Sequence, residues 1–309
     1  MVEDLHPDAA TMVERQRRLQ RLLPEQSVRG LRWLTRLGAW FRDAPPVAQV
    51  VDRTIPGPDG EIPIRVYRPE GEHPFPTVVY FHGGGFVSGS LESHDALCRY
   101  LTRESECVVV SVDYRLAPEH PFPAAVEDAI AATEWVAEHT DALAGSGDLA
   151  VAGDSAGGNL AAVAALAARA RGGPDIDYQV LIYPGIGTRE DQQSVRDHAG
   201  LVLSEADLEW FRDCYYGSEI TLQNPYADPT RACDHSGLPP ATVLTAEFDP
   251  LRDGGVIYAE QLRDAGVDVR HVDYEGMIHG FVSMTDAIDR STDAIADVAG
   301  DIETALFDA

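Results

Sequence analysis

Leu149-Ala-Val-Ala-Gly-Asp-Ser155-Ala-Gly157 is the stretch of sequence that decides the fold. Its first four residues form a short apolar run, typical of a strand covered on both faces, and an Ala-rich helical segment follows it. Between the two, Ser155 stands in the pattern G-x-S-x-G. A serine nucleophile needs a tight, strained turn from strand to helix, on which larger neighbours would collide. The stretch therefore predicts a nucleophile elbow, in which the backbone N–H of Ala156 begins a helix and can bind a developing oxyanion.

A glycine-rich loop precedes the elbow in the chain. His82-Gly83-Gly84-Gly85 follows the apolar run Thr77–Phe81, and three glycines allow the backbone to approach a substrate carbonyl closely. A phosphate-binding loop is the alternative, but neither G-x-G-x-x-G nor G-x-x-x-x-G-K-S/T follows. We expect two groups of residues at this place: oxyanion donors (Gly83, Gly84, Ala156) and loop-supporting residues (His82, Gly85, Asp154).

The partners that Ser155 needs come later in the chain. A nucleophilic serine requires a histidine base, and the base requires an orienting carboxylate, in the chain order serine, acid, histidine. Asp249 comes just after the apolar run Thr242–Ala246, and His279 just after Val269–Tyr274. Both fall at the carboxyl ends of predicted strands, the edge where open α/β sheets build their sites. We expect Ser155, Asp249 and His279 to form a catalytic triad. Asp253 is the competing acid, whereas Asp154 faces elsewhere on the elbow.

The order of elements predicts the α/β-hydrolase type of architecture. Alternating strands and helices favour a mostly parallel central sheet of about eight strands, flanked by helices and covered by a helical cap. The turn signal Pro56–Gly60 predicts a hairpin ahead of the parallel part. The predicted strands are Val50–Ile55, Glu61–Tyr67, Thr77–Phe81, Cys107–Val112, Leu149–Ala152, Gln179–Tyr183, Thr242–Ala246 and Val269–Tyr274; the predicted helices are Leu91–Arg103, Ala124–Glu138, Asn159–Arg169, Glu205–Tyr216 and Gly255–Ala265.

Two segments are predicted to form a cap rather than to contribute strands to the sheet. Residues 1–45 carry the pattern of two helices divided by Pro24, and some fifty residues after Pro184 contain no clear strand, as in a lid. We therefore expect cap helices at 1–45, a catalytic domain at 46–184 and 240–309, and a cap insertion at 185–239.

Taken together, the motifs resemble the hormone-sensitive-lipase-like family of microbial carboxylesterases. The resemblance spans Phe75 to Phe281 and rests on His82–Gly85, the elbow, and three further motifs: Asp113-Tyr114-Arg115-Leu116-Ala117-Pro118-Glu119, Asp249-Pro250-Leu251-Arg252-Asp253 and His279-Gly280-Phe281. It implies an α/β-hydrolase fold with Ser155 as nucleophile, His279 as base and Asp249 as its partner. It also implies Gly83, Gly84 and Ala156 as oxyanion donors, and a cap made from the N-terminal helices and the insertion after Pro184.

The charge of the chain is unusual. Its 309 residues carry 51 Asp and Glu against 24 basic residues, a formal net charge of −27, and every basic residue is Arg. Such a field repels phosphate backbones, so we expect no nucleic-acid partner. Acidity together with the absence of Lys resembles proteins of extreme halophiles, in which salt screens the self-repulsion. The alternative is an ordinary acidic protein from a genome that favours Arg.

The sequence contains no recognisable motif for a metal, a membrane span or a secretory signal. The four cysteines form no C-x-x-C pair, and the ten histidines form no metal-binding pattern, so we expect neither a metal nor another cofactor. No apolar stretch is long enough for a membrane span and no secretory signal is visible, so we expect a cytoplasmic protein without membrane insertion.

These observations predict a serine carboxylesterase that forms an acyl-enzyme intermediate on small-molecule esters. The resemblance implies uncharged esters with short to medium acyl chains. An amide or peptide hydrolase with the same triad is the alternative, and a non-catalytic small-ligand receptor is a further one. The receptors that this family resembles lack the catalytic histidine, whereas His279 stands in its motif. The last strand, Val269–Tyr274, is expected at a sheet edge through which the protein forms a homodimer.

Overall fold

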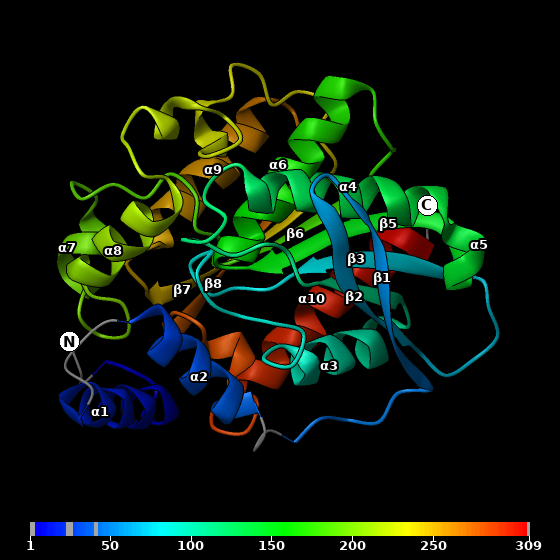
Figure 1. Cartoon of the computed structure of the whole chain (residues 1–309). Coiled ribbons are helices and arrows are strands. Elements are labelled where there is room, and N and C mark those ends of the chain that lie inside the picture. The colour runs from blue at the N-terminus through cyan, green and yellow to red at the C-terminus, as the bar shows by residue number, and fades with distance from the viewer. Residues whose placement is uncertain (1–3, 23–26, 40–42, 308–309) are drawn as a thin grey trace.

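A single sheet dominates the computed structural model, which describes residues 4–22, 27–39 and 43–307 (Figure 1). The strand order is β1-β2-β4-β3-β5-β6-β7-β8. β2 pairs antiparallel with β1 on one side and with β4 on the other, and all further pairs are parallel. The strands are β1 (Gln49–Gly57), β2 (Gly60–Arg68), β3 (Phe75–Phe81), β4 (Val108–Val112), β5 (Gly145–Asp154), β6 (Tyr178–Ile182), β7 (Ala241–Phe248) and β8 (Val269–Ile278). All eight predicted strands and the predicted fold class are confirmed.

Helices cover both faces of the sheet. Along β5, Leu149 and Val151 join one apolar cluster and Ala150 and Ala152 the other, because successive strand residues point to opposite faces. Figure 1 shows α3 (Asp95–Ser105) and α10 (Arg290–Phe307) on one face, and α4 (Ala124–Glu138), α6 (Ala156–Arg171) and α9 (Arg252–Asp264) on the other. The short helix α5 (Thr140–Leu143) lies between α4 and β5.

The central helix, α6, explains why an alanine-rich segment follows the elbow. Its residues from Ala156 to Ala167 are all buried, and most of them are Ala or Gly. Small side chains let a helix approach a sheet closely, and alanine also has the highest helix propensity. The same segment therefore forms the helix readily and fills the densest part of the core.

The segments predicted as cap carry helices joined by loops, and no strand, in the residues that the structure describes. The N-terminal part forms α1 (Pro7–Leu22) and α2 (Val28–Ala39); Pro24, predicted to divide them, lies outside the described residues. The segment after β6 carries α7 (Gln193–His198), α8 (Glu205–Tyr215) and the short 3₁₀ turns η1 (Thr221–Gln223) and η2 (Pro229–Arg231). Gln16 of α1 donates to the carbonyl of Val202 at 2.8 Å, so the two segments contact each other.

Several elements differ from the predicted pattern. The helices α5, α7 and α10 are absent from the predicted elements, although Ile295, Val298 and Ile302 of the C-terminal helix α10 have helical spacing and are buried. Helix α3 begins at Asp95 instead of Leu91. Ser90 and Ser93 exchange side-chain and backbone hydrogen bonds at 2.9 and 3.3 Å, which forms a turn and delays the helix by one turn. Within the described residues, no helix is sufficiently long and apolar to span a membrane.

Candidate active site

Ser155 lies on a strained turn between β5 and α6. Its φ of 54° and ψ of −117° are unfavourable for a residue with a side chain. The turn fits because Gly157 carries no side chain: a Cβ there would lie 1.8 Å from the carbonyl oxygen of Phe81. The elbow predicted from the sequence is therefore present, and it presents the Ser155 hydroxyl at the carboxyl edge of the sheet.

A chain of hydrogen bonds joins the three residues predicted as a triad. His279 follows β8, and its Nε2 lies 2.9 Å from the Ser155 Oγ. Asp249 follows β7, and its Oδ2 lies 2.7 Å from the His279 Nδ1. The Asp249 side chain is fully buried and also accepts the backbone N–H of Leu251 at 2.8 Å, which fixes its orientation. The competing acid, Asp253, instead accepts the backbone N–H of Ser194 at 3.0 Å.

The ring of Tyr183 packs against His279, with their centroids 4.9 Å apart. Tyr183 follows β6, is buried and has a positive φ of 33°. Burial raises the pKa of its hydroxyl well above the usual value, so the phenol stays neutral. The His279 ring is thus held by Asp249 on one side and by a neutral aromatic ring on another.

The glycine-rich loop corrects one prediction. The N–H of Gly83 donates to the Asp154 Oδ1 at 2.8 Å, so it is not available to an oxyanion. In contrast, the N–H groups of Gly84, Gly85 and Ala156 have no protein acceptor among the described residues, and all three residues line the cavity with Ser155. The loop therefore offers Gly84 and Gly85, one position further along the chain than expected.

The predicted supporting residues surround this loop. His82 is fully buried, its Nδ1 lies 2.9 Å from the carbonyl of Gly83, and its ring stacks on Tyr114 at 4.3 Å. Burial, assisted by the charge of His94, lowers the pKa of His82 to about 3, so its ring is neutral. Asp154 holds Gly83, as described above. Gly85, expected as a support, instead lies against the Phe211 ring in the cavity wall.

A cavity of about 970 Å³ opens above Ser155 and His279. Helix α2 contributes Leu31 and Thr35 to its wall, and α8 contributes Leu208 and Phe211. Seven carboxylate side chains also line it, against three guanidinium groups. They are Asp154, Glu190, Asp191, Glu205, Glu209, Glu219 and Asp228, and the guanidinium groups are those of Arg189, Arg212 and Arg231. The cavity is thus apolar in part and carries an excess of negative charge.

Arg32 fixes α2 to the catalytic part of the chain. Its guanidinium donates to the carbonyl of Val87 at 2.8 Å and to that of Ala117 at 2.9 Å, and it makes a bidentate pair with Glu119 at 2.7 and 2.9 Å. Val87 lies two residues after Gly85, the last residue of the glycine-rich loop. One side chain therefore connects a helix of the cavity wall to the segment that follows the glycine-rich loop beside Ser155.

Sequence reasoning missed Arg32, Tyr80 and His94. The Tyr80 hydroxyl donates to the Asp154 carboxylate at 2.8 Å. Tyr80 belongs to the buried strand β3, where a sequence pattern identifies an aromatic residue only as part of the core. His94 was hidden inside a predicted helix. The serine pair that surrounds Glu92 was the available signal, because serines just before a helix indicate a capping turn. No group of three or more His, Cys, Asp or Glu in the described part of the chain is arranged to hold a metal ion.

Comparisons with known proteins identify the family of the chain. Residues 78–283 match the profile of a family described as having the alpha/beta hydrolase fold. The chain is 45% identical over 265 residues to the esterase LipI of Mycobacterium tuberculosis, which covers 82% of this chain and 83% of that protein. It is 42% identical to the carboxylesterase NlhH of the same organism, over 81% of this chain and 80% of that one.

A solved structure is similar over nearly the whole chain. The hyperthermophilic esterase from the archaeon Pyrobaculum calidifontis is 44% identical, covers 97% of this chain and 98% of its own, and superposes with a TM-score of 0.91. The chain described here therefore belongs to the hormone-sensitive-lipase-like group of the α/β-hydrolase family and is a carboxylic ester hydrolase.

Proposed function

We propose that Ser155 is the nucleophile of this carboxylic ester hydrolase, His279 its general base and Asp249 the carboxylate that orients the base. The observation that carries the proposal is the unbroken hydrogen-bond chain Asp249–His279–Ser155, with its serine end in a cavity. The Nδ1–H of His279 donates to Asp249, which leaves Nε2 with the lone pair that faces the Ser155 hydroxyl.

The reaction proceeds in two halves through an acyl-enzyme. Ser155 Oγ attacks the ester carbonyl while its proton passes to His279 Nε2, and the carbonyl oxygen becomes an oxyanion. When the carbonyl re-forms, the C–O bond to the alcohol breaks and His279 protonates the leaving alkoxide. A water molecule then attacks the acyl-serine in the same way, its proton passes to His279, and the carboxylic acid leaves as Ser155 recovers the proton.

The N–H groups of Gly84, Gly85 and Ala156 are proposed as the oxyanion donors. They border Ser155 in the cavity and, among the described residues, lack protein acceptors, in contrast to Gly83. A preorganised donor of this kind lowers an acyl-transfer barrier by roughly 3 kcal/mol. Because Ala156 belongs to the elbow and the two glycines to the loop, the hole forms only when these segments are held at a fixed separation.

The substrates proposed are uncharged esters with short to medium acyl chains. The apolar side chains from α2 and α8 offer a surface for an acyl chain, and the cavity volume bounds its length. The surplus of carboxylates disfavours esters that carry a negative charge. We further propose that α1, α2 and the insertion 185–239 together act as the cap, because α2 and the insertion line the cavity and α1 contacts the insertion.

Hydrolysis of p-nitrophenyl esters from acetyl to palmitoyl tests this proposal, with wild type, Ser155→Ala and the exposed Ser146→Ala as matched control. We expect highest kcat/KM at short chains, a loss of about 10³-fold or more in Ser155→Ala with its fold intact, and no change in Ser146→Ala. An organophosphate should inactivate the wild type with one equivalent bound per chain. Retained turnover in Ser155→Ala would contradict the proposal. Hydrolysis of amides in preference to these esters, or binding without turnover, would contradict it as well.

The working environment is proposed from charge. A net charge of −27 with no Lys supports a protein adapted to molar salt in the cytoplasm of a halophile. A homodimer is likewise proposed: β8 lies at the end of the strand order, and its outer edge is unpaired within the described sheet. Light scattering in high salt tests the dimer, and a monomeric mass would contradict it.

A further inference from the structure

The position of the glycine-rich loop depends on one carboxylate. Gly83 donates its N–H to the Asp154 Oδ1 at 2.8 Å, and Asp154 directly precedes Ser155. There is no free space in this contact, because a Cβ on Gly83 would lie 2.4 Å from the Asp154 Oδ2. Asp154 therefore joins the loop that carries Gly84 and Gly85 to the elbow that carries Ser155.

The Asp154 carboxylate is buried, and its charge must be compensated. Its side chain accepts the Tyr80 hydroxyl at 2.8 Å, and the group that can carry the opposite charge is His94, with Nε2 at 3.2 Å from Oδ1 and 3.4 Å from Oδ2. Burial by itself would raise the pKa of Asp154, but the charge of His94 and the hydrogen bonds from His94, Tyr80 and Gly83 outweigh it and lower the pKa. The carboxylate thus stays ionised inside the protein.

A count of protons assigns the state of His94. The Ser93 hydroxyl has one proton, and its contacts include two groups that could accept it, the Ser90 carbonyl at 2.9 Å and the His94 Nδ1 at 2.8 Å. If Ser93 donates to Ser90, His94 Nδ1 must be the donor to Ser93. Nε2 must also be a donor, because it faces an ionised carboxylate. The assignment that satisfies all these contacts together has both ring nitrogens protonated.

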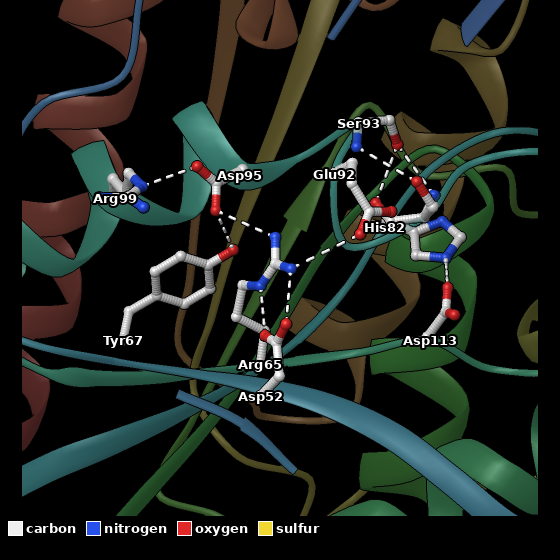
Figure 2. A network of polar contacts seen from close by, with 10 residues as sticks. Asp52, Arg65, Tyr67, His82, Glu92, Ser93, Asp95, Arg99 and Asp113 are labelled. Atoms are coloured by element: carbon white, nitrogen blue, oxygen red, sulfur yellow. Dashed lines mark hydrogen bonds and ion pairs between the residues drawn. The ribbon is translucent and has the colours of Figure 1, made fainter. Parts of the chain in front are cut away.

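The segment that carries His94 is itself anchored from the sheet, as Figure 2 shows. Glu92 and Asp95 on either side of it pair with Arg65 of β2, at 3.5 and 3.3 Å. Arg65 also makes a bidentate pair with Asp52, and Asp95 accepts the Tyr67 hydroxyl at 2.9 Å. The His94 ring therefore meets Asp154 from a rigid position rather than from a mobile loop.

We propose that His94 is a positioning residue for ester hydrolysis: as an imidazolium it holds Asp154, and through Asp154 the Gly83 N–H, so that the Gly84 and Gly85 donors stay aligned with Ser155. This proposal rests on the proposed oxyanion role of Gly84 and Gly85. His94 has no hydrogen bond to the triad among the described residues and acts through Asp154. Its ring lines the cavity wall although the residue is only 7% exposed, so a small molecule could occupy the space that a truncation leaves.

The kinetic test compares His94→Ala and His94→Gln with wild type, with His139→Gln on the exposed end of α4 as matched control. Loss of loop alignment acts on the transition state, so we expect kcat for p-nitrophenyl acetate to fall by about 10- to 100-fold in His94→Ala, with KM within about twofold. His94→Gln keeps an N–H donor but not the positive charge, so its kcat should lie between those of wild type and His94→Ala. His139→Gln should match wild type.

Chemical rescue separates positioning from general destabilisation. Added imidazole should restore at least about a tenth of the lost kcat in His94→Ala, measured against His94→Ala/Ser155→Ala to subtract hydrolysis by imidazole itself, and should leave His139→Gln unchanged. No rescue, together with a KM increase as large as the loss in kcat, would overturn the proposal.

A spectroscopic test on the unmodified enzyme does not depend on turnover or on the folding of a variant. In protein labelled with ¹⁵N-histidine at the assay pH, we expect one buried ring with two protonated nitrogens, whose signals disappear in His94→Gln. A singly protonated His94 would overturn the assignment. Loss of all activity in wild type with this signal present would instead count against the proposed function.

Discussion

Asp113 adjoins the fully buried ring of His82, with its Oδ1 3.9 Å from the His82 Nε2 (Figure 2). Burial, together with the nearby charge of Glu92, raises the pKa of Asp113 to about 6, although Arg36 and Arg65 act in the opposite direction. The folded protein therefore holds the proton of this carboxyl over a range of pH in which the unfolded chain has lost it. At neutral pH the site carries a charge that its surroundings disfavour.

The consequence for stability has a definite sign. A carboxyl with a raised pKa contributes stability that is complete below its unfolded pKa, near 4, and that is lost as the pH rises toward 6. We expect the Tm of Asp113→Asn to rise relative to the Tm of wild type as the pH increases from about 4 to 7, because only the wild type then acquires the disfavoured charge. Thermal unfolding across this range measures the difference. A difference in Tm that is constant with pH would contradict the assignment.

Two glycines of helices offer a matched test of packing. Gly157 has no room for a Cβ, because the backbone carbonyl of Phe81 would lie 1.8 Å away, whereas a Cβ on Gly300 of α10 meets nothing within 4 Å. We expect Gly157→Ala to lose soluble expression or at least about 3 kcal/mol of unfolding free energy, a cost typical of severe overpacking. Gly300→Ala should gain up to about 1 kcal/mol from helix propensity. Chemical denaturation measures both, and equal effects would contradict the close approach.

At the scale of single residues, the sequence predicts those site residues that are defined by a local motif and by their order along the chain. Ser155, Asp249 and His279 were reachable because each follows an apolar run at one edge of the sheet. Gly83 was assigned wrongly, because which N–H of a glycine run faces the cavity depends on a contact with Asp154, 71 residues away. The pairing of His94 with Asp154 was not predictable, since a buried ion pair leaves no periodic signal in the chain and the serines at 90 and 93 indicate only the turn before the helix.

Among the elements, α2 depends most visibly on a single contact. Arg32 joins it to Val87, Ala117 and Glu119, while its neighbours Leu31 and Thr35 line the cavity. We expect Arg32→Ala to raise KM for hexanoyl and octanoyl esters by about 3- to 10-fold and to change kcat for the acetyl ester by less than about twofold, because the acyl-binding wall loosens while the triad stays in place.

Arg29→Ala provides the control for this variant. Arg29 lies on the same helix and is exposed, so its removal changes the charge of α2 equally but leaves the contacts of Arg32 with the catalytic part intact. We expect its kinetic constants to equal those of wild type. A uniform loss of kcat for every chain length in Arg32→Ala would show that Arg32 acts on the glycine-rich loop through Val87 and not on the acyl-binding wall.

The strands of the sheet and the long helices that flank it were predictable because their apolar patterns are strong. The helix α4 begins and ends at the predicted residues, Ala124 and Glu138. The start of α3 was not predictable from periodicity, because the exchange of hydrogen bonds between Ser90 and Ser93 overrides an apolar spacing that includes Leu91. The packing of α2 against the loop at Val87 depends on contacts between distant parts of the chain, which no local pattern contains.

For the whole molecule, charge is the dominant property. With a net charge of −27, mutual repulsion of carboxylates opposes the compact state, and its range falls from about 10 Å in 0.1 M salt to about 3 Å in 1 M salt. We therefore expect Tm to rise steadily with KCl, by roughly 5 °C or more between 0.1 and 2 M, and ester hydrolysis to rise with it.

A charge-reduced variant controls for general effects of salt on water. Four exposed carboxylates outside the cavity wall, Glu70, Glu72, Glu134 and Glu138, can be replaced by Gln without touching the core. This variant should melt at a higher temperature than wild type in low salt and show a shallower increase with KCl. A melting temperature that does not change with salt in wild type would contradict the proposed adaptation to molar salt.

The origin of the cavity wall has a consequence for how such proteins diversify. Ser155, Asp249 and His279 follow the ends of β5, β7 and β8, whereas α2 and α8 reach the same cavity from other parts of the chain. We expect mutations at the cavity-lining residues of these two helices to change which esters enter, provided that Arg32, which holds Val87, and Phe211, which packs against Gly85, are kept. A library confined to the other lining positions of α2 and α8 can therefore explore new esters while the strands that carry Ser155, Asp249 and His279 are unchanged.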